Sequence, residues 1–345
     1  MPKRVLITGG MGFIGKAILT RLIDLGFAVI SVDSMRPQVH NHPIKDEIRA
    51  INIQEDIRST KILTQLLKTF KPEILVHLAA ETGTGQSYFD PMLHTGTNVD
   101  GTASIIKAIA DSGTSLEYII LSSSRAIYGE GAYRTQDEKV VYPNGRTAFQ
   151  YERKLWEYEQ LSYIDANAEI TIANPTSIYG STKYTQELLL KNWAIPNSVP
   201  IGIFRLQNVY GVGQDASNPY TGILNIFIKQ ALRGESIELY EDGQATRDFI
   251  YIDDVAKVML QAISKKINGT FDVGTGKRTS LIEVGDTIAA ALKSPPPLIS
   301  GKYRIGDVRH ASCDSSFTRN TLGRDPIFLK QGLDKLLPWL KKGTH

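Results

Sequence analysis

The sequence predicts a doubly wound α/β fold, in which helices cover both faces of a parallel sheet. Short and almost wholly apolar runs recur along the first 125 residues, and each is followed by a segment whose apolar residues have helical spacing. Strands that are apolar on both sides belong inside such a sheet, because both of their faces are covered. With 345 residues the chain exceeds a usual single domain, so a second, smaller mixed α/β domain is expected.

The first 33 residues read as one strand-helix-strand unit. Residues 5–8 are apolar or β-branched and stop at glycines, and residues 16–25 place their apolar side chains on one helical face. Gly26 is suited to end that helix, and residues 28–32 follow as a second buried strand.

The same alternation continues further along the chain. We expect helices over 58–70 and 95–111, and strands over 74–78 and 118–121. Parallel sheets of this kind bind ligands at the carboxyl ends of their strands. These elements define a first domain over 1–200.

Residues 131–173 differ from their surroundings, since charged and aromatic residues dominate there and residues 149–161 could form an amphipathic helix. The remainder, 201–345, is expected to form the second domain, with some segments crossing back to the first. Its predicted elements are strands over 201–205 and 248–252 and helices over 222–232, 253–264, 281–292 and 333–340.

Composition and charge exclude several classes of protein. The formal net charge is +3 without long runs of one sign, so nucleic acid is not expected as a partner. No apolar stretch approaches 18 residues, which gives no reason to expect a membrane segment. Cys313 is the only cysteine, as suits a reducing compartment, and a cytoplasmic protein is expected. No metal is expected, since the histidines show no ligand spacing beyond His40 and His42.

Gly10, Gly12 and Gly15 match G-x-G-x-x-G at the junction of the first strand and helix. Such glycines allow a tight turn and a close approach to a pyrophosphate, which the helix N-terminus attracts; this predicts a Rossmann-type dinucleotide site. Asp33 ends the second strand at about the distance expected for the acid that binds the adenine ribose, which favours NAD over NADP. Arg36 could instead meet a 2′-phosphate.

A tyrosine and a lysine, Tyr179 and Lys183, are spaced to share one helical face. A lysine ammonium beside the phenol would lower the tyrosine pKa from about 10, so that the tyrosine could act as a base. Residues 122–124 are three serines at the end of a predicted strand, where hydroxyls would lie beside a bound nicotinamide.

Together these residues resemble the extended short-chain dehydrogenase/reductases, and within them the nucleotide-sugar 4-epimerases, including dTDP-L-rhamnose 4-epimerase-like and UDP-sugar 4-epimerase-like enzymes. The motifs that carry the resemblance lie at 8–15, 77–80, 122–129, 179–183, 205–211, 247–255 and 304–309. It implies an NAD-dependent inversion of C4 in a nucleotide-diphosphate sugar, dTDP-L-rhamnose to dTDP-6-deoxy-L-talose being one possibility, and a homodimer as the assembly.

The resemblance also implies roles for individual residues. The catalytic residues would be Ser124, Tyr179 as base and Lys183. The cofactor would be held by Gly9, Gly12, Phe13, Ile14, Gly15, Asp33, Asp56, Ile57, Leu78, Ala79, Ala80, Asn98 and Ser122, together with Tyr179 and Lys183. The substrate would be held by Thr84, Ser124, Asn208, Arg247, Arg304 and Asp307.

Two departures from the family pattern bear on function. Ser124 and Tyr179 are 55 residues apart, more than in most relatives, so residues 131–173 hold an insertion that either covers the sugar pocket or decorates the surface. Arg125 and Ala126 stand where related 4,6-dehydratases carry an acid pair, which favours epimerisation over dehydration. A keto-sugar reductase, a dehydratase and a non-catalytic dinucleotide-responsive regulator are the alternatives.

Overall fold

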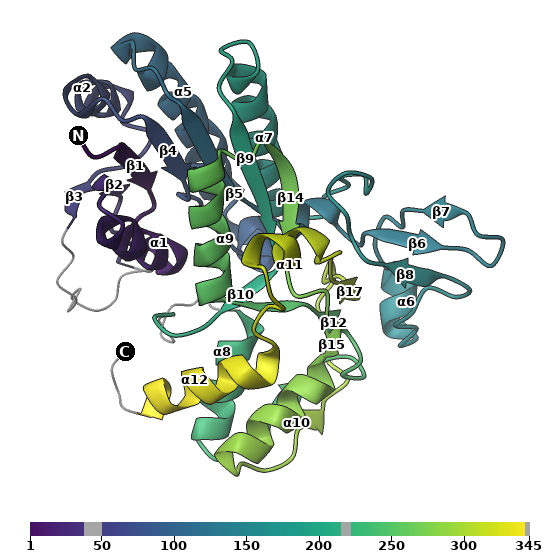
Figure 1. Cartoon of the computed structure of the whole chain (residues 1–345). Coiled ribbons are helices and arrows are strands. Elements are labelled where there is room, and N and C mark those ends of the chain that lie inside the picture. The colour runs from purple at the N-terminus through teal and green to yellow at the C-terminus, as the bar shows by residue number, and fades with distance from the viewer. Residues whose placement is uncertain (38–49, 215–221, 342–345) are drawn as a thin grey trace.

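The computed structural model describes residues 1–37, 50–214 and 222–341. Its centre is a seven-stranded sheet in the order β14-β9-β5-β4-β1-β2-β3, and every neighbouring pair is parallel (Figure 1). The strands are β1 (Arg4–Thr8), β2 (Ala28–Asp33), β3 (Ile51–Gln54), β4 (Ile74–His77), β5 (Tyr118–Ser124), β9 (Ile201–Leu206) and β14 (Gly269–Val273). The predicted parallel α/β sheet is confirmed.

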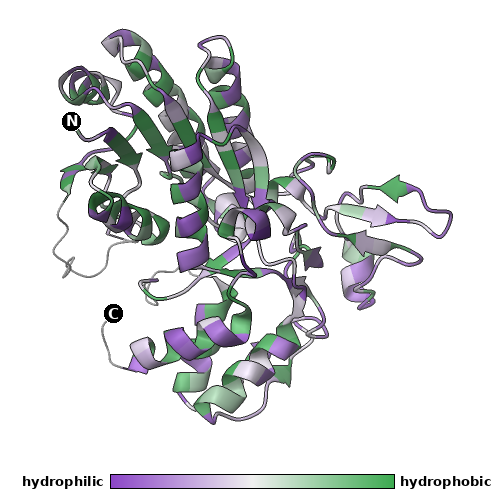
Figure 2. Cartoon of the chain, viewed as in Figure 1, coloured by the Kyte–Doolittle hydropathy of each residue, from purple (hydrophilic) through white to green (hydrophobic). Residues whose placement is uncertain are grey.

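Helices cover both faces of this sheet. They are α1 (Phe13–Asp24) and α9 (Ile252–Lys265) on one face, and α2 (Thr60–Phe70), α5 (Gly101–Ser112) and α7 (Ile178–Ala194) on the other. Alternate residues of each strand enter different cores: Ile7 packs with α1 and α9, whereas Leu6 packs with α2 and α5. Figure 2 shows the central strands as mainly hydrophobic and the helices as mixed, as this packing requires.

The helix expected over 95–111 is part of a longer helical run. It consists of α4 (Pro91–Thr95), a π-helical turn η1 (Gly96–Asp100) and α5, and it follows the short helix α3 (Thr84–Phe89). Asp90 caps α4 by accepting a hydrogen bond from the amide of Leu93 at 3.0 Å.

The second lobe lies beyond the carboxyl ends of the strands (Figure 1). Its core joins α8 (Ile223–Leu232), α10 (Leu281–Leu292) and α12 (Leu329–Lys341). The smaller elements of this half of the chain are β10 (Asn208–Tyr210), β11 (Glu238–Leu239), β12 (Thr246–Arg247), β13 (Phe249–Tyr251), β15 (Thr279–Ser280), β16 (Leu298–Ile299), β17 (His310–Ala311) and α11 (Ser316–Leu322). Because β9, α9 and β14 return to the large sheet, residue 200 does not divide the chain in space.

Residues 131–173 form a separate projection at the right of Figure 1. Its small antiparallel sheet has the order β7-β6-β8, from β6 (Ala132–Arg134), β7 (Val140–Val141) and β8 (Ser162–Ile164). The helix expected over 149–161 is wrong in length, since α6 spans only Ala148–Glu152. A capping box of Thr147 and Gln150 starts it, and Lys154 in a left-handed conformation (φ +55°) prevents its continuation.

Within the described residues, no helix combines the length and the apolar composition needed to cross a membrane.

Candidate active site

A large cavity of about 2540 Å³ opens at the carboxyl ends of β1, β2, β4 and β5 and reaches the second lobe. A pocket for one small ligand is typically about 300 to 1000 Å³, so this cavity has room for a dinucleotide and a second ligand together. The predicted site residues that line it are Gly9, Gly12, Phe13, Ile14, Gly15, Asp33, Asp56, Ile57, Leu78, Ala79, Ala80, Thr84, Ser122, Tyr179, Asn208, Arg247, Arg304 and Asp307.

The glycine-rich turn makes the floor of this cavity. Gly9 has φ +70°, and a Cβ there would lie 2.7 Å from the backbone nitrogen of Ala79. A Cβ on Gly15 would overlap the carbonyl oxygen of Gly9, so both positions admit only glycine. Gly12 caps α1 without any side-chain hydrogen bond, which leaves the first amides of the helix available to an anion. This cradle fits the pyrophosphate of a dinucleotide.

Asp33 is fixed at the carboxyl end of β2. Its carboxylate accepts hydrogen bonds from the backbone amides of Met11 and Met35, each at 3.0 Å. Arg36, the alternative contact for a 2′-phosphate, forms an ion pair with the buried carboxylate of Glu81. A fixed carboxylate repels a 2′-phosphate and accepts hydrogen bonds from ribose hydroxyls, and Arg36 is already neutralised by Glu81, so the geometry favours NAD over NADP.

Two of the predicted cofactor contacts, Asn98 and Lys183, are not among the residues that line the cavity. Asn98 is fully buried in η1, where its Oδ1 accepts from the amide of Glu81 at 2.7 Å. Its Nδ2 donates to the carbonyl of Glu81 and to Thr182 Oγ1 at 3.0 and 2.9 Å. Asn98 therefore joins the Glu81 loop to α7, and its polar atoms are satisfied by the protein itself.

Tyr179 faces the cavity from the first turn of α7, where Ser177 caps the helix by accepting from the amide of Gly180 at 3.0 Å. Burial raises the pKa of the Tyr179 phenol above its ordinary value of 10, and a hydrogen bond from Ser124 together with the charge of Arg125 opposes that shift only in part. The expectation of a lowered pKa for Tyr179 is thus wrong, because desolvation outweighs both stabilising contacts.

Lys183, which was expected to act on Tyr179 and to hold the cofactor, is not among the residues that line the cavity. It lies behind Tyr179, 2% exposed, and its Nζ donates to Gln186 Oε1 at 2.6 Å. Burial lowers the pKa of Lys183 to about 7, against the attraction of Glu187. The Gln186 amide also donates to Thr102 Oγ1 at 2.9 Å, so a buried polar network holds the lysine in place.

The positively charged side chain that acts on Tyr179 is Arg125. From the sequence, Arg125 was noted only because it stands where related dehydratases carry an acid. It lines the cavity directly after Ser124, whose Oγ accepts from the amide of Ala126 at 3.1 Å. Among the described residues, the guanidinium of Arg125 makes no hydrogen bond or ion pair. Its place next to the serine in the chain was the one signal that could have identified it.

The predicted substrate residues Arg247, Arg304 and Asp307 line the cavity from the second half of the chain. Arg247 is held by donating to the carbonyl oxygens of Val308 and Arg309 at 2.8 and 3.1 Å. The guanidinium of Arg304 lies over the ring of Tyr240, 5.2 Å from its centroid. Two arginines that line one cavity, which Asn208 and Thr84 also line, suit the two phosphates of a nucleotide diphosphate.

Insertion residues 131–173 do not line this cavity, so the insertion is not a cover over it. No cluster of histidine, cysteine and acidic side chains able to hold a metal occurs among the described residues, which leave out His40 and His42.

A parallel sheet with a glycine cradle for a dinucleotide, and Tyr179 in the same cavity with Ser124 acting on its phenol, define a dinucleotide-dependent enzyme of the short-chain dehydrogenase/reductase type. The chain belongs to the NAD dependent epimerase/dehydratase family, whose model matches residues 5–274. It is an enzyme of the epimerase type and uses NAD, so the resemblance drawn from the sequence motifs is confirmed.

Individual relatives agree with this assignment. The chain is 41% identical to dTDP-L-rhamnose 4-epimerase of Burkholderia thailandensis, over 98% of this chain and 95% of that protein. It is 29% identical to UDP-glucose 4-epimerase of Mycolicibacterium smegmatis, over 99% of this chain and 100% of that protein. Among solved structures, UDP-glucose 4-epimerase of Thermotoga maritima with UDP-glucose superposes with a TM-score of 0.82 at 26% identity, covering 99% of this chain and 100% of that one.

Proposed function

We propose that this enzyme inverts C4 of a dTDP-linked 6-deoxyhexose and interconverts dTDP-L-rhamnose and dTDP-6-deoxy-L-talose. The observation that carries the proposal is that Tyr179 lines the same cavity as the glycine cradle, while Ser124 and the cation Arg125 both act on its phenol. The 41% identity to a dTDP-L-rhamnose 4-epimerase supports this choice of nucleotide and sugar.

In this proposal the chain's own residues manage the proton of the reacting hydroxyl. Ser124 positions the sugar O4, and Tyr179 as phenolate takes the O4 proton as the carbinol is oxidised, then returns it after reduction. NAD, held by Gly9 to Gly15 and Asp33, supplies the hydride acceptor and donor. The raised pKa of Tyr179 means that the phenolate fraction, and with it kcat/KM, increases with pH on the acid side of the profile.

Inversion needs a 4-keto sugar that rotates within the site, so that its other face receives the hydride, while its nucleotide stays bound. Arg247 and Arg304 are proposed to hold the diphosphate, since both line the cavity and Arg247 donates to the backbone carbonyls of Val308 and Arg309. Binding energy placed on the nucleotide holds the substrate without restraining the sugar ring.

The alternative functions differ in the bonds that change at the sugar carbons and in how the cofactor is used. A 4,6-dehydratase needs an acid and a base for C5 and C6, and Arg125 and Ala126 occupy those positions. A keto-sugar reductase would consume reduced cofactor in proportion to product. A non-catalytic regulator would bind NAD and leave every sugar unchanged.

The test is incubation of dTDP-L-rhamnose with the enzyme in D₂O, followed by proton NMR. We expect inversion at C4 with no net reduced cofactor and no deuterium at C3, C4 or C5, because hydride leaves and returns at C4 and the transferred proton resides on oxygen. Deuterium at C5 would show dehydratase chemistry, and cofactor oxidised in step with product would show a reductase. A panel of dTDP-, UDP-, GDP- and CDP-sugars that all remain unchanged would contradict catalysis.

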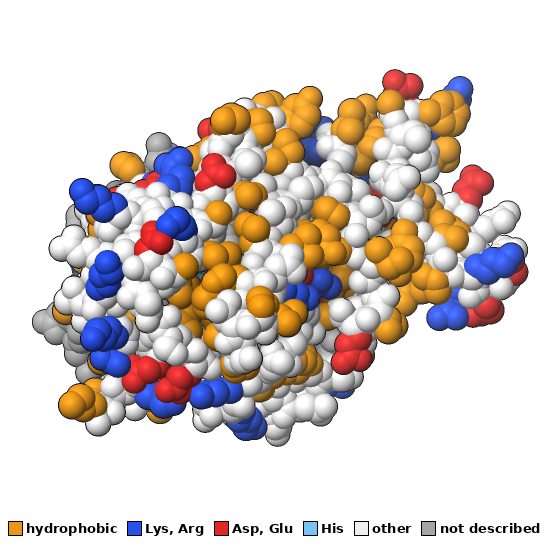
Figure 3. All heavy atoms as spheres, turned by 90° about the horizontal axis from the view of Figure 1, so that it is seen from above, with side chains coloured by type: hydrophobic (Ala, Val, Ile, Leu, Met, Phe, Trp, Pro, Cys, Tyr) orange, Lys and Arg blue, Asp and Glu red, His pale blue; other side chains and the backbone are white. Residues whose placement is uncertain are grey.

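We also propose that the enzyme is a homodimer joined through α4, α5 and α7. Exposed apolar side chains occur in and beside these helices, with Phe89 85%, Met92 81% and Leu188 42% exposed. Figure 3, which views the molecule from above, shows apolar side chains in the middle of that face and most of the charged side chains toward its two ends. Light scattering should give about twice 38.2 kDa for the wild type and about 38.2 kDa for a Met92→Arg/Leu188→Arg variant. A wild-type mass of one chain would contradict the proposal.

A further inference from the structure

The insertion over 131–173 lies against the outer side of the segment 304–308, whose inner side lines the cavity. Arg304, Ile305, Gly306, Asp307 and Val308 all face the cavity. This segment contains a turn, closed by the Asp307 amide bonded to the Arg304 carbonyl at 3.2 Å, and Gly306 has φ +87°. A turn of this kind has few contacts of its own, so its shape depends on what supports it.

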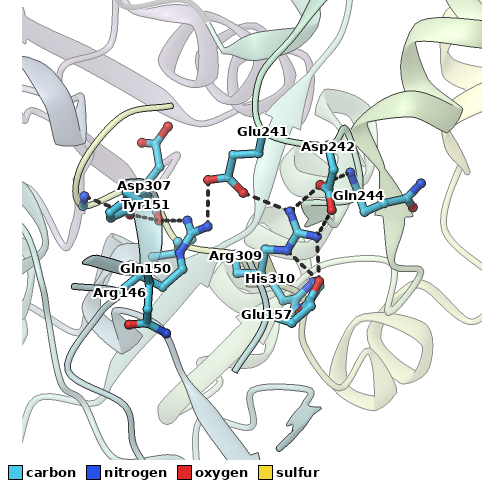
Figure 4. Close-up of polar contacts among 12 residues, drawn as sticks. Arg146, Gln150, Tyr151, Glu157, Glu241, Asp242, Gln244, Asp307, Arg309 and His310 are labelled. Carbon is cyan, nitrogen blue, oxygen red and sulfur yellow. Dashed lines mark hydrogen bonds and ion pairs between the residues drawn. The ribbon is translucent and has the colours of Figure 1, made fainter. Parts of the chain in front are cut away.

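Two insertion side chains supply that support. Arg146 Nη2 donates to the carbonyl oxygen of Asp307 at 2.7 Å. The Tyr151 hydroxyl donates to the same oxygen at 3.4 Å and accepts from the amide of Gly306 at 3.3 Å. The Gly306 amide and the Asp307 carbonyl of the turn are therefore hydrogen-bonded by side chains of the insertion, and not by the lobe to which the turn belongs (Figure 4).

The supporting side chains are themselves fixed. Arg146 is fully buried, forms an ion pair with Glu241 Oε1 at 2.8 Å, and stacks over the ring of Tyr151 at 4.7 Å. Tyr151 stacks in turn on Tyr303, with ring centroids 5.0 Å apart. Glu241 also lines the cavity, so Arg146 braces the cavity wall at two places.

A second cluster ties the same region to the insertion. Arg309 is 1% exposed and its guanidinium donates to Glu157 Oε1 at 2.7 Å, and to both carboxylate oxygens of Asp242 at 2.7 and 2.9 Å. Its backbone amide donates to Glu130 Oε2 at 3.0 Å. The segment 304–308 is thus held just beyond its end by Arg309 and along its outer side by Arg146 and Tyr151.

We infer that the insertion is a brace that sets the position of the nucleotide-binding wall, with Arg146 and Tyr151 as positioning residues that do not touch the substrate. The inference rests on the proposed function, because it takes Arg304 and Asp307 as contacts of the nucleotide diphosphate. The contacts to the nucleotide are the same in the bound substrate and in the transition state. Loss of the brace therefore weakens both equally, which raises KM and leaves kcat nearly unchanged.

The test is Tyr151→Phe, which removes the hydroxyl that bonds Gly306 and Asp307 and keeps the stacked ring. We expect KM for dTDP-L-rhamnose and Kd for dTDP to rise about fivefold, the order of effect of one lost hydrogen bond, with kcat within about twofold of wild type. Amide hydrogen exchange in 302–310, measured without substrate, should become faster. Melting temperature and NAD affinity should change little.

Tyr142→Phe is the matched control, since the Tyr142 hydroxyl accepts a hydrogen bond from the amide of Ile172 within the insertion, at 3.3 Å. It should leave KM, Kd and exchange in 302–310 unchanged. Arg146→Lys, which retains the charge but cannot reach both Glu241 and Asp307 in the same way, should reproduce the Tyr151→Phe pattern.

The outcomes separate the inference from the proposed function. If the wild type binds dTDP and converts the sugar, while Tyr151→Phe matches it in KM, Kd and exchange, the brace is refuted and the epimerase stands. A fall in kcat at unchanged KM would also refute it. If the wild type binds no nucleotide and converts no sugar, the proposed function fails and the inference fails with it.

Discussion

Replacing Tyr179 by phenylalanine should reduce kcat by about 10² to 10⁴-fold, the range typical for loss of a general base. The substitution removes one oxygen from a side chain that faces the cavity and is hydrogen-bonded to Ser124. The ring remains, so the packing of α7 against the sheet should persist. Steady-state turnover of dTDP-L-rhamnose, NAD affinity by calorimetry and the melting temperature together measure the effect, and only turnover should change greatly.

The matched control for this substitution is Tyr184→Phe, the same chemical change in α7. Tyr184 packs against the small core of Ile127, Tyr128, Ala166 and Cys313 and does not line the cavity. It should retain nearly full activity. Turnover that survives in Tyr179→Phe would mean that Ser124 or another group carries the O4 proton.

Replacing Arg125 by methionine should move the acid side of the kcat/KM profile to higher pH. The Arg125 charge lowers the pKa of Tyr179 against the raising effect of burial, so without it the phenolate forms only in more alkaline solution. An opposite charge nearby typically changes a pKa by about one unit or more, so kcat/KM at pH 7 should fall about tenfold and recover as pH rises.

Arg125→Lys keeps a positive charge at the same position and should restore most of the wild-type pH profile. A profile that falls equally at every pH in Arg125→Met would instead show that the guanidinium acts on the substrate and not on the tyrosine. An unchanged profile would contradict any part for Arg125 in the proton transfer.

The sequence alone determined the sheet, the dinucleotide cradle and the family. Buried parallel strands are apolar along their whole length, and the glycine positions follow from short backbone contacts such as that between Gly9 and Ala79, so both leave local patterns that can be read directly. The family resemblance assigned Asp33, Tyr179 and Arg247 to one site, and all three line the same cavity.

Only the tertiary structure decided which charges meet. Lys183 was expected beside Tyr179 from helical spacing, yet it turns to Gln186, and Arg125 from another element supplies the nearby cation. Asn98 matched a cofactor position but satisfies its polar atoms with Glu81 and Thr182. Hydrogen-bond partners and desolvation depend on groups far apart in the chain, and sequence periodicity reports only neighbours within one element.

The insertion shows the same limit. Its composition marked 131–173 as distinct, but the sequence left open whether it covers the pocket or decorates the surface, and the structure shows it packed behind the segment 304–308. Arg146 and Asp307 are about 160 residues apart in sequence and come together at 2.7 Å. A contact between a side chain and a distant backbone carbonyl leaves no mark on the identity of the residue that accepts it, because every residue carries the same carbonyl group.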